Sequence, residues 1–135
     1  MSNFKKSDAV QSLKNLKPFV PAFQLSILAG LIDGEEGQYF IDTVVELDYL
    51  IQQMPKTYEQ DGKGDQAVAY LHYFMGGMDW YITEKDMEDE QFQAFGLANL
   101  GYGAELGYIS IEELKANNIE IDLHFTPTMV GNLKK

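Results

Sequence analysis

A series of short strands interrupted by one capped helix occupies residues 78–127, and this pattern sets the fold class of the chain. We predict strands at 78–84, 92–99, 105–109 and 119–125, each bounded by glycine, proline or acidic turn residues. Between the last two, Ser110 and Glu113 have the spacing of a capping box, which predicts a short helix ending near Asn117. Short strands that follow one another closely favour an antiparallel sheet.

Residues 67–75 form a further predicted strand whose two faces are both largely apolar. A strand covered on both sides, in the centre of a sheet, explains this pattern. The following Gly76-Gly77 is a two-residue turn and predicts a hairpin into the 78–84 strand. We interpret His72, in the middle of the strand, as a hydrogen-bonded core histidine rather than a ligand. Gly96, inside the 92–99 strand, indicates a bulge or a close approach of another backbone.

The N-terminal part of the chain is expected to be helical. Ser7 is the predicted N-cap of a helix over 8–17, and Pro18 ends it. Residues 22–32 are apolar and are interpreted as a second helix, although an extended segment has the same composition. Over 38–54, apolar residues recur at spacings of three and four, which predicts an amphipathic helix that ends at Pro55.

Together these elements predict an α+β fold, with a mostly antiparallel sheet of four to five strands packed by the N-terminal helices. One short capped helix precedes the last strand. We expect a single domain over residues 1–135, with 1–43 as a helical extension and 54–127 as the α+β core. A chain of this length buries enough surface to fold without disulfides or a structural metal.

Acidity is the clearest global property. The chain has 21 acidic residues and ten basic ones, all of them lysine, for a formal charge of −11. Residues 1–17 carry +3 and the last two lysines +2, so 20 acids against four lysines leave −16 over 18–133. Such a field repels phosphate backbones, and the chain lacks the guanidinium that reads guanine and phosphate. The composition therefore argues against direct nucleic-acid binding. The acidity is explained first by solubility, and the alternative is a nucleic-acid mimic or a binder of basic proteins, for which the partner is another protein.

Several chemistries are excluded or unsupported. Cysteine is absent, which rules out disulfides, thiolate metal sites and cysteine nucleophiles. The 57–65 loop lacks the ending of a phosphate-binding loop, and the acids at 33–36 lack the spacing of a calcium loop. We therefore predict no cofactor and no metal. No apolar run reaches the length of a membrane span and no signal sequence is evident, so we expect a cytoplasmic protein with no membrane partner.

Two sets of residues are candidates for function. An enzyme would use carboxylates near a histidine, namely Glu84, Asp86 and Glu105 with His124, for acid–base or metal-assisted hydrolysis. In the predicted last strand, Glu120 and Asp122 share a face with His124, which favours its imidazolium form. A binding surface would instead combine aromatic anchors with the surrounding polar groups. The predicted binding residues are Trp80, Tyr81, Glu84, Glu105, Tyr108 and His124.

Five ordered motifs carry a resemblance to a known family. They are Pro55-Lys-Thr-Tyr-Glu-Gln-Asp-Gly-Lys-Gly-Asp65, Trp80-Tyr81 with Glu84, Phe95-Gly96-Leu97, Glu105-Leu-Gly-Tyr108 and Asp122-Leu-His-Phe-Thr-Pro127. With these, residues 54–127 resemble the bacterial domain-of-unknown-function family numbered 2958, found in plasmids, conjugative elements and phages. Ile121 departs from the pattern, because the family usually has arginine there. The resemblance implies a mobile-element setting and supplies no activity.

Three functional hypotheses follow. The first is a small acidic, non-enzymatic accessory protein that acts by protein–protein contact; in one specific form it inhibits a host defence enzyme by occupying its nucleic-acid site. The alternative is a hydrolytic enzyme centred on His124 and Glu105. The third is nucleic-acid binding through the lysine-bearing termini.

Overall fold

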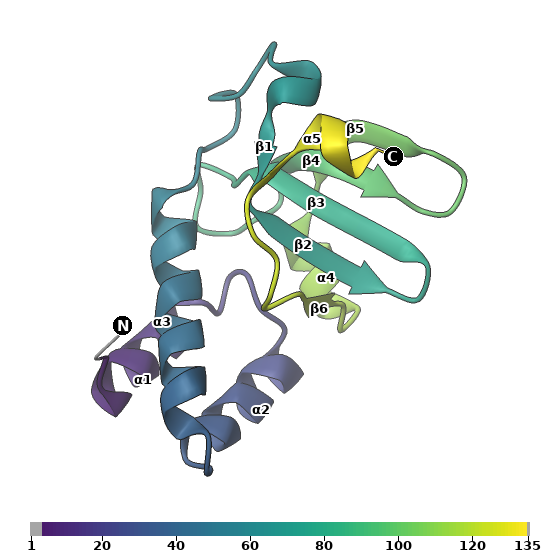
Figure 1. The fold of residues 1–135 in the computed structure, drawn as a ribbon. Helices are drawn as coiled ribbons and strands as arrows, with labels where there is room; N and C mark the ends of the chain where they lie inside the picture. The colour runs from purple at the N-terminus through teal and green to yellow at the C-terminus, as the bar shows by residue number, and fades with distance from the viewer. Residues whose placement is uncertain (1–3, 135) are drawn as a thin grey trace.

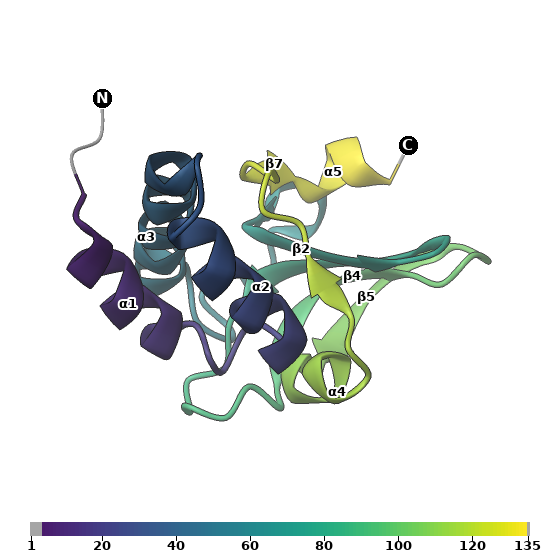
Figure 2. The same cartoon turned by 90° about the horizontal axis from the view of Figure 1, so that it is seen from below.

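A five-stranded antiparallel sheet backed by helices forms the framework of the chain in a computed structural model, which describes residues 4–134. The strand order is β5-β4-β3-β2-β6 (Figure 1). Figure 2 shows α4 on one side of the sheet and α5 with β7 on the other, with α1, α2 and α3 grouped together. The predicted α+β class, with N-terminal helices and a short helix before the last strand of this sheet, is confirmed.

Three helices precede the sheet, namely α1 (Lys6–Asn15), α2 (Ala22–Ile32) and α3 (Gly37–Gln53). The α1 helix begins earlier than predicted, and Ser7 is not its N-cap. Instead the Asp8 carboxylate accepts a hydrogen bond from the backbone N–H of Lys5 at 2.8 Å, so Lys5 takes the cap position. A carboxylate in the first turn also interacts favourably with the helix dipole.

The α2 helix is linked to the edge of the sheet by a buried amide. Gln24 Nε2 donates to the carbonyl of Ile121 at 2.9 Å, and Gln24 Oε1 accepts from the N–H of Ile121 at 3.0 Å. These two bonds satisfy the free backbone edge of β6 (Glu120–Ile121), which would otherwise be an exposed sheet edge. Ile121 itself is buried in the core.

The central strands follow the predicted hairpin. Strands β2 (Leu71–Met75) and β3 (Met78–Glu84) pair with Met75 opposite Met78, so Gly76-Gly77 is the two-residue turn. Strand β4 (Ala94–Asn99) pairs with β3 and with β5 (Ala104–Ile109). Helix α4 (Ile111–Ala116) follows, and Ser110 Oγ accepts from the N–H of Glu113 as predicted. Asn118 then adopts a left-handed conformation after the helix.

The predicted strand over 119–125 is wrong beyond Ile121. Asp122 turns the chain, because its carboxylate accepts from the N–H of His124 at 2.9 Å in an Asx-type turn. The chain then forms β7 (Thr128–Met129) and α5 (Val130–Leu133), which were not predicted. Strand β7 pairs with β1 (Val68–Ala69), the first part of the segment predicted as one strand over 67–75. The short 3₁₀ helix η1 (Gly64–Gln66) precedes β1.

One hydrophobic cluster joins the helices to the inner face of the sheet, which is the face that carries Leu71, Tyr73 and Ile82. Tyr73 is fully buried, its hydroxyl donates to the carbonyl of Phe19, and burial raises its pKa. A smaller cluster of Ala67, Leu97 and Val130 lies on the outer face beneath α5.

Coverage of both faces of β2 was predicted, and this is wrong for the outer face. Phe74 is 36 % exposed and His72 is only partly buried. The reason is that the small C-terminal elements cover the outer face only in part, whereas residues of α1, α2, α3 and α4 all pack into the core on the inner face. Among residues 4–134, no helix is both long and apolar enough to cross a membrane.

Gly96 confirms the predicted close approach. A Cβ atom at this position would lie 1.9 Å from the carbonyl oxygen of Tyr81, far inside van der Waals contact. Across the β4–β5 pair, Gly107 lies directly opposite Gly96, and a Cβ there would meet nothing within 4 Å. The two glycines therefore form a matched pair for a test of strand packing.

We expect Gly96→Ala to lower the free energy of unfolding by at least about 2 kcal/mol, because the β3 and β4 backbones must move apart. Gly107→Ala should change it by less than about 0.5 kcal/mol. Urea denaturation followed by circular dichroism measures both. Equal effects of the two substitutions would contradict the close approach at Gly96.

Candidate functional site

A pocket of about 430 Å³ lies between the loop after α3 and the outer face of the sheet. We call it the Glu84 pocket. It is lined by Thr57, Tyr58, Gln60, Asp61, Gly62, Gly64, Ala67, Thr83, Glu84, Phe95, Leu106 and Tyr108. All of them except Ala67 come from the 55–65 loop, β3, β4 and β5, so four of the five motif segments of the sequence converge here.

Two buried side chains hold the loop on the sheet. Gln60 donates from Nε2 to the carbonyls of Val68 and Thr83, both at 2.8 Å, and its Oε1 accepts from the N–H of Val68 at 2.7 Å. Thr57 Oγ1 lies 2.9 Å from the carbonyl of Gln93 and 3.1 Å from that of Lys85. These contacts satisfy the polar atoms of both side chains in a buried position, so they fix the loop backbone over the pocket.

A β-bulge brings Glu84 into the pocket. Ile82 pairs with Gly96 and Glu84 pairs with Phe95, so Thr83 is the extra residue on β3. Successive residues of a regular strand point to opposite faces, yet Thr83 and Glu84 both line the pocket. The bulge therefore re-aims the Glu84 side chain, a common role of bulges beside functional sites.

The Glu84 carboxylate is the chemical centre of the pocket. Glu84 is only 4 % exposed. Its Oε1 accepts from the N–H of Tyr58 at 2.6 Å, and its Oε2 lies 3.1 Å from the Thr83 hydroxyl. An ionised carboxylate accepts about four hydrogen bonds, so roughly two acceptor sites remain. None of the ion pairs found among residues 4–134 involves Glu84.

Tyr58 spans the pocket from its floor to its rim. Its backbone has a φ of 79°, a left-handed conformation that is uncommon for a residue with a side chain and that is held here by the bond to Glu84. Its hydroxyl lies 2.7 Å from the hydroxyl of Tyr108. Both rings are well exposed, at 60 % and 58 %. The two tyrosines therefore form an accessible aromatic rim above a buried acid.

The hydroxyl pair and the nearby acids also shift the pKa of Tyr108 at the rim. The pKa of Tyr108 is raised, first by the hydrogen bond with Tyr58, then by desolvation and by nearby charges that include Asp61 and Glu84. These acids disfavour a second negative charge in the pocket and favour a positive one.

The predicted site residues are dispersed, and only Glu84 and Tyr108 meet in this pocket. Trp80 points to the inner face and packs against the main core. Tyr81 points to the outer face, where it stacks on the ring of His72 with centroids 4.5 Å apart. Glu105 is exposed on β5. His124 is exposed in the turn after β6, with its Nδ1 3.5 Å from the hydroxyl of Tyr39.

The structure does not bring Glu105 and His124 together. Glu105 lies on β5, and His124 follows β6, so the two lie at opposite edges of the sheet. Four strand spacings separate those edges, a distance of about 19 Å. A shared acid–base centre needs side chains within reach of a common atom, which this arrangement does not provide.

The histidine between two carboxylates is His72, not His124. Its Nε2 lies 2.7 Å from Asp79 Oδ1, and its Nδ1 lies 3.0 Å from Asp122 Oδ2. The expectation that Asp122 accompanies His124 on one strand face is wrong because the strand ends at Ile121. Both ring nitrogens of His72 have protein partners, so the histidine is hydrogen-bonded as predicted, but it lies on the partly covered outer face rather than in the core. In the part of the chain described, no cluster of three or more His, Asp or Glu residues is arranged to hold a metal ion.

Sequence reasoning missed several pocket residues. Tyr58, Asp61 and Thr83 are among them. Tyr58 and Asp61 belong to the Pro55–Asp65 motif, which indicated a family resemblance but not a pocket, and which lacks the ending of a phosphate-binding loop. Because a left-handed Tyr and a bulged Thr have no sequence signature of their own, the pocket was not predicted.

The fold and the site define the class of protein: an α+β chain with a helix-backed antiparallel sheet and an acidic pocket rimmed by tyrosines. A family model described as "Protein of unknown function (DUF2958)" matches residues 43–130, and the chain belongs to this family. The match includes every residue that lines the Glu84 pocket, whereas α1 and α2 lie outside it. Neither a curated protein nor a solved structure matches the chain.

Replacement of Tyr58 by Phe should lower the pKa of Tyr108 toward the ordinary tyrosine value of about 10, because the hydrogen bond with Tyr58 is the largest cause of its rise. Because the pKa of Tyr108 is higher in the folded than in the unfolded state, the bond stabilises the folded state below pH ~10. This stabilisation is lost as the pH rises through the pKa of the folded state. The measurement is a titration of ¹³Cζ-labelled tyrosine by NMR.

The exposed Tyr102 is the control, since it is outside the Glu84 pocket. Tyr102→Phe should leave the pKa of Tyr108 unchanged. A Tyr108 pKa that is the same in Tyr58→Phe as in the wild type would contradict the hydroxyl pair.

Proposed function

We propose that this chain is a non-enzymatic accessory protein that acts by contact with another protein, and that the Glu84 pocket receives a cationic side chain of that partner. The observation that carries the proposal is the buried Glu84 carboxylate, which has spare acceptor capacity at the floor of an accessible pocket. A buried charge is costly unless an opposite charge or several hydrogen bonds satisfy it. A cation entering from a partner would supply both.

The pocket has the chemistry that a lysine or arginine side chain requires. Carboxylates accept charge-assisted hydrogen bonds from ammonium and guanidinium groups, and arginine binds them through two parallel bonds. The faces of tyrosine and phenylalanine attract cations, and Tyr58, Phe95 and Tyr108 all line the pocket. Asp61 adds a second acid at the same site. The pocket volume of about 430 Å³ accommodates a long side chain with its terminal group.

The charge around the pocket extends this argument to a basic partner surface. Exposed acids lie on the 57–65 loop, at Glu59 and Asp61, and on the loop between β3 and β4, at Glu88, Asp89 and Glu90. The two loops are joined by hydrogen bonds, since Thr57 contacts the backbone of Lys85 and Gln93. The acidic 57–65 loop over the pocket favours a partner rich in lysine and arginine, whereas Glu88 and Asp89 line a separate pocket with Lys56 and Lys85.

A specific form of this proposal is an inhibitor of a host defence enzyme. Nucleic-acid sites are rich in lysine and arginine, and an acidic protein that carries −11 competes for them by presenting charge of the same sign as phosphate. The mobile-element setting implied by the family resemblance is compatible with this role. Binding of an arginine from such a site in the Glu84 pocket would add specificity to an otherwise general attraction.

We expect Nα-acetyl-arginine amide, used as a probe in a ¹H–¹⁵N NMR titration, to shift the amide signals of Tyr58, Thr83 and Glu84 in a saturable manner. Glu84→Gln should abolish the saturable shifts, because the neutral amide removes the charge while its oxygen keeps the acceptor for Tyr58. Glu105→Gln is the matched control, because it removes the same charge from an exposed position on β5.

The neutral analogue Nα-acetyl-norleucine amide distinguishes cation binding from apolar binding. Equal shifts with both probes, or undiminished arginine binding in a folded Glu84→Gln variant, would overturn the proposal. Thermal unfolding of each variant checks that the fold is retained.

The inhibitor form is tested by capture of partners from a bacterial lysate at about 0.5 M NaCl, where charges are screened over roughly 4 Å. An enzyme that acts on nucleic acid should be captured by the wild type and by Glu105→Gln but not by Glu84→Gln. The purified enzyme should lose activity when it is mixed with the wild-type protein. If only abundant cationic proteins are captured and 0.5 M NaCl releases all of them, the inhibitor form of the proposal is wrong. The proposal that the Glu84 pocket binds a cationic side chain is tested separately by the arginine titration.

A further inference from the structure

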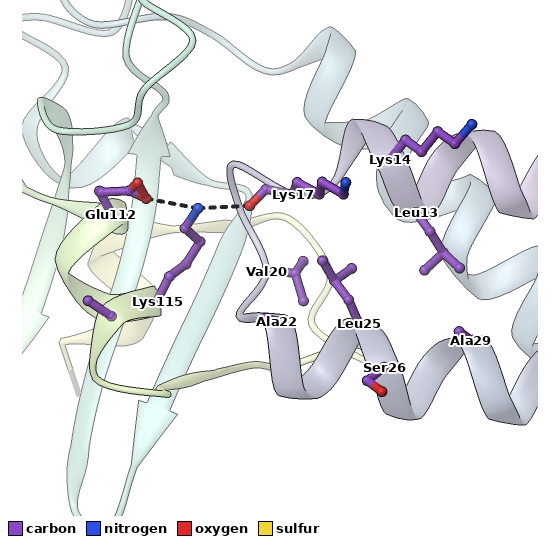
Figure 3. Close-up of a pocket in the computed structure, with 11 residues that line it drawn as sticks. Leu13, Lys14, Lys17, Val20, Ala22, Leu25, Ser26, Ala29, Glu112 and Lys115 are labelled. Carbon is purple, nitrogen blue, oxygen red and sulfur yellow. Dashed lines mark hydrogen bonds and ion pairs between the residues drawn. The ribbon is translucent and has the colours of Figure 1, made fainter.

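A second concave surface lies between α1, α2 and α4 and shares no lining residue with the Glu84 pocket. We call it the α2 groove, and Figure 3 shows the side chains that line it. It has a volume of about 740 Å³, larger than the Glu84 pocket. Most of its lining residues lie in α1, in α2 or in the turn between them, outside residues 43–130 that match the family. The groove is therefore built mainly from residues outside the part of the chain that the family model matches.

The floor of the groove is apolar and its α2 wall is flat. Leu13, Val20 and Leu25 contribute aliphatic side chains. Ala22, Ser26 and Ala29 line the α2 side at spacings of four and three, which places them on one face of the helix. All three are small and exposed. Small side chains along such a face allow another helix backbone to approach closely.

The rim of the groove is basic although the chain is acidic. Lys14, Lys17 and Lys115 line it together with a single acid, Glu112. Glu112 is neutralised by Lys115, whose Nζ lies 2.8 Å from its Oε1. Lys115 Nζ also donates to the carbonyl of Lys17 at 2.8 Å, as Figure 3 shows, and thereby fixes α4 to the turn after α1. The groove thus carries net positive charge on a protein of −11.

We propose that the α2 groove binds an acidic amphipathic helix of a partner protein. Apolar residues of that helix would cover Leu13, Val20 and Leu25, in the helix-in-groove mode of recognition. Its flanking glutamate or aspartate side chains would pair with Lys14 and Lys17, whose long stems cover apolar surface while their ammonium groups stay in water. The choice of occupant rests on charge complementarity, because a basic rim around an apolar floor selects an acidic and apolar ligand.

The same charge argument disfavours a second copy of this chain as the occupant. Two copies at −11 each repel one another, and residues 18–133 carry −16 of that charge. The groove and the Glu84 pocket also differ in sign, with a basic rim on the first and an acidic floor in the second. They therefore select opposite ligands, and a test of one does not depend on the other.

The test uses two fluorescein-labelled model peptides of about 18 residues, long enough to form an amphipathic helix. Both have the same leucine and alanine face, and their polar faces carry either glutamate or lysine. Fluorescence anisotropy should show saturable binding of the glutamate peptide in the groove, whereas any binding of the lysine peptide at the Glu84 pocket should be unaffected by substitutions in the groove. Ser26→Trp, which fills the groove, should weaken binding at least about tenfold, as should the double variant Lys14→Glu and Lys17→Glu.

Matched controls separate the groove from its surroundings. Ile27→Trp places the same large ring on the neighbouring exposed residue of α2, outside the groove lining. The double variant Lys56→Glu and Lys63→Glu makes the same change of charge away from the groove. Both controls should bind the glutamate peptide as the wild type does.

Three outcomes would overturn the proposal. Equal binding of the two peptides, with both weakened by Ser26→Trp, would show that charge does not select the ligand of the groove. Self-association in light scattering that is lost in Ser26→Trp would assign the groove to a second copy of the chain. Binding to anionic lipid vesicles that is lost in Ser26→Trp, without peptide binding, would assign it to a membrane surface.

Discussion

The β-bulge at Thr83 is the constraint on which the site depends. If β3 had no bulge, Thr83 would occupy a regular strand position, and alternation would point the Glu84 side chain to the inner face with Ile82. With it, Glu84 lies under the 57–65 loop and accepts the backbone N–H of Tyr58. That bond holds Tyr58 in its left-handed conformation and so places its ring near Tyr108. One local irregularity therefore connects the sheet, the loop and the aromatic rim.

The helical and sheet parts are connected by a small number of long-range polar contacts within a shared core. Gln24 bonds to both backbone groups of Ile121, and the Tyr73 hydroxyl reaches the carbonyl of Phe19. Buried polar groups of this kind are costly unless they are satisfied, so they favour one relative placement of helices and sheet. The α2 groove depends on this placement, because its walls come from α1, α2 and α4.

Two surfaces of opposite character result. The Glu84 pocket belongs to the family-matched region, has an acidic floor and favours cations. The α2 groove is contributed mainly by residues outside that region, has a basic rim and an apolar floor, and favours an acidic helix. The formal charge of −11 therefore describes neither surface by itself.

The sequence by itself determined the features that arise from neighbouring residues. The helices over 22–32 and 38–54, the Gly76-Gly77 hairpin, the Ser110 cap and the close approach at Gly96 follow from periodicity, turn chemistry and the lack of a side chain. It also identified Glu84 and Tyr108 as candidates, but it grouped them with Glu105 and His124, which lie elsewhere. Only the tertiary structure decided that His72, rather than His124, lies between two carboxylates, and that Tyr58 meets Glu84. Those pairings join residues 7 to 50 positions apart in the chain, and Asp122 leaves the strand in order to reach His72. Local propensity cannot specify such contacts, because their free energy is gained only when the separate segments have packed together.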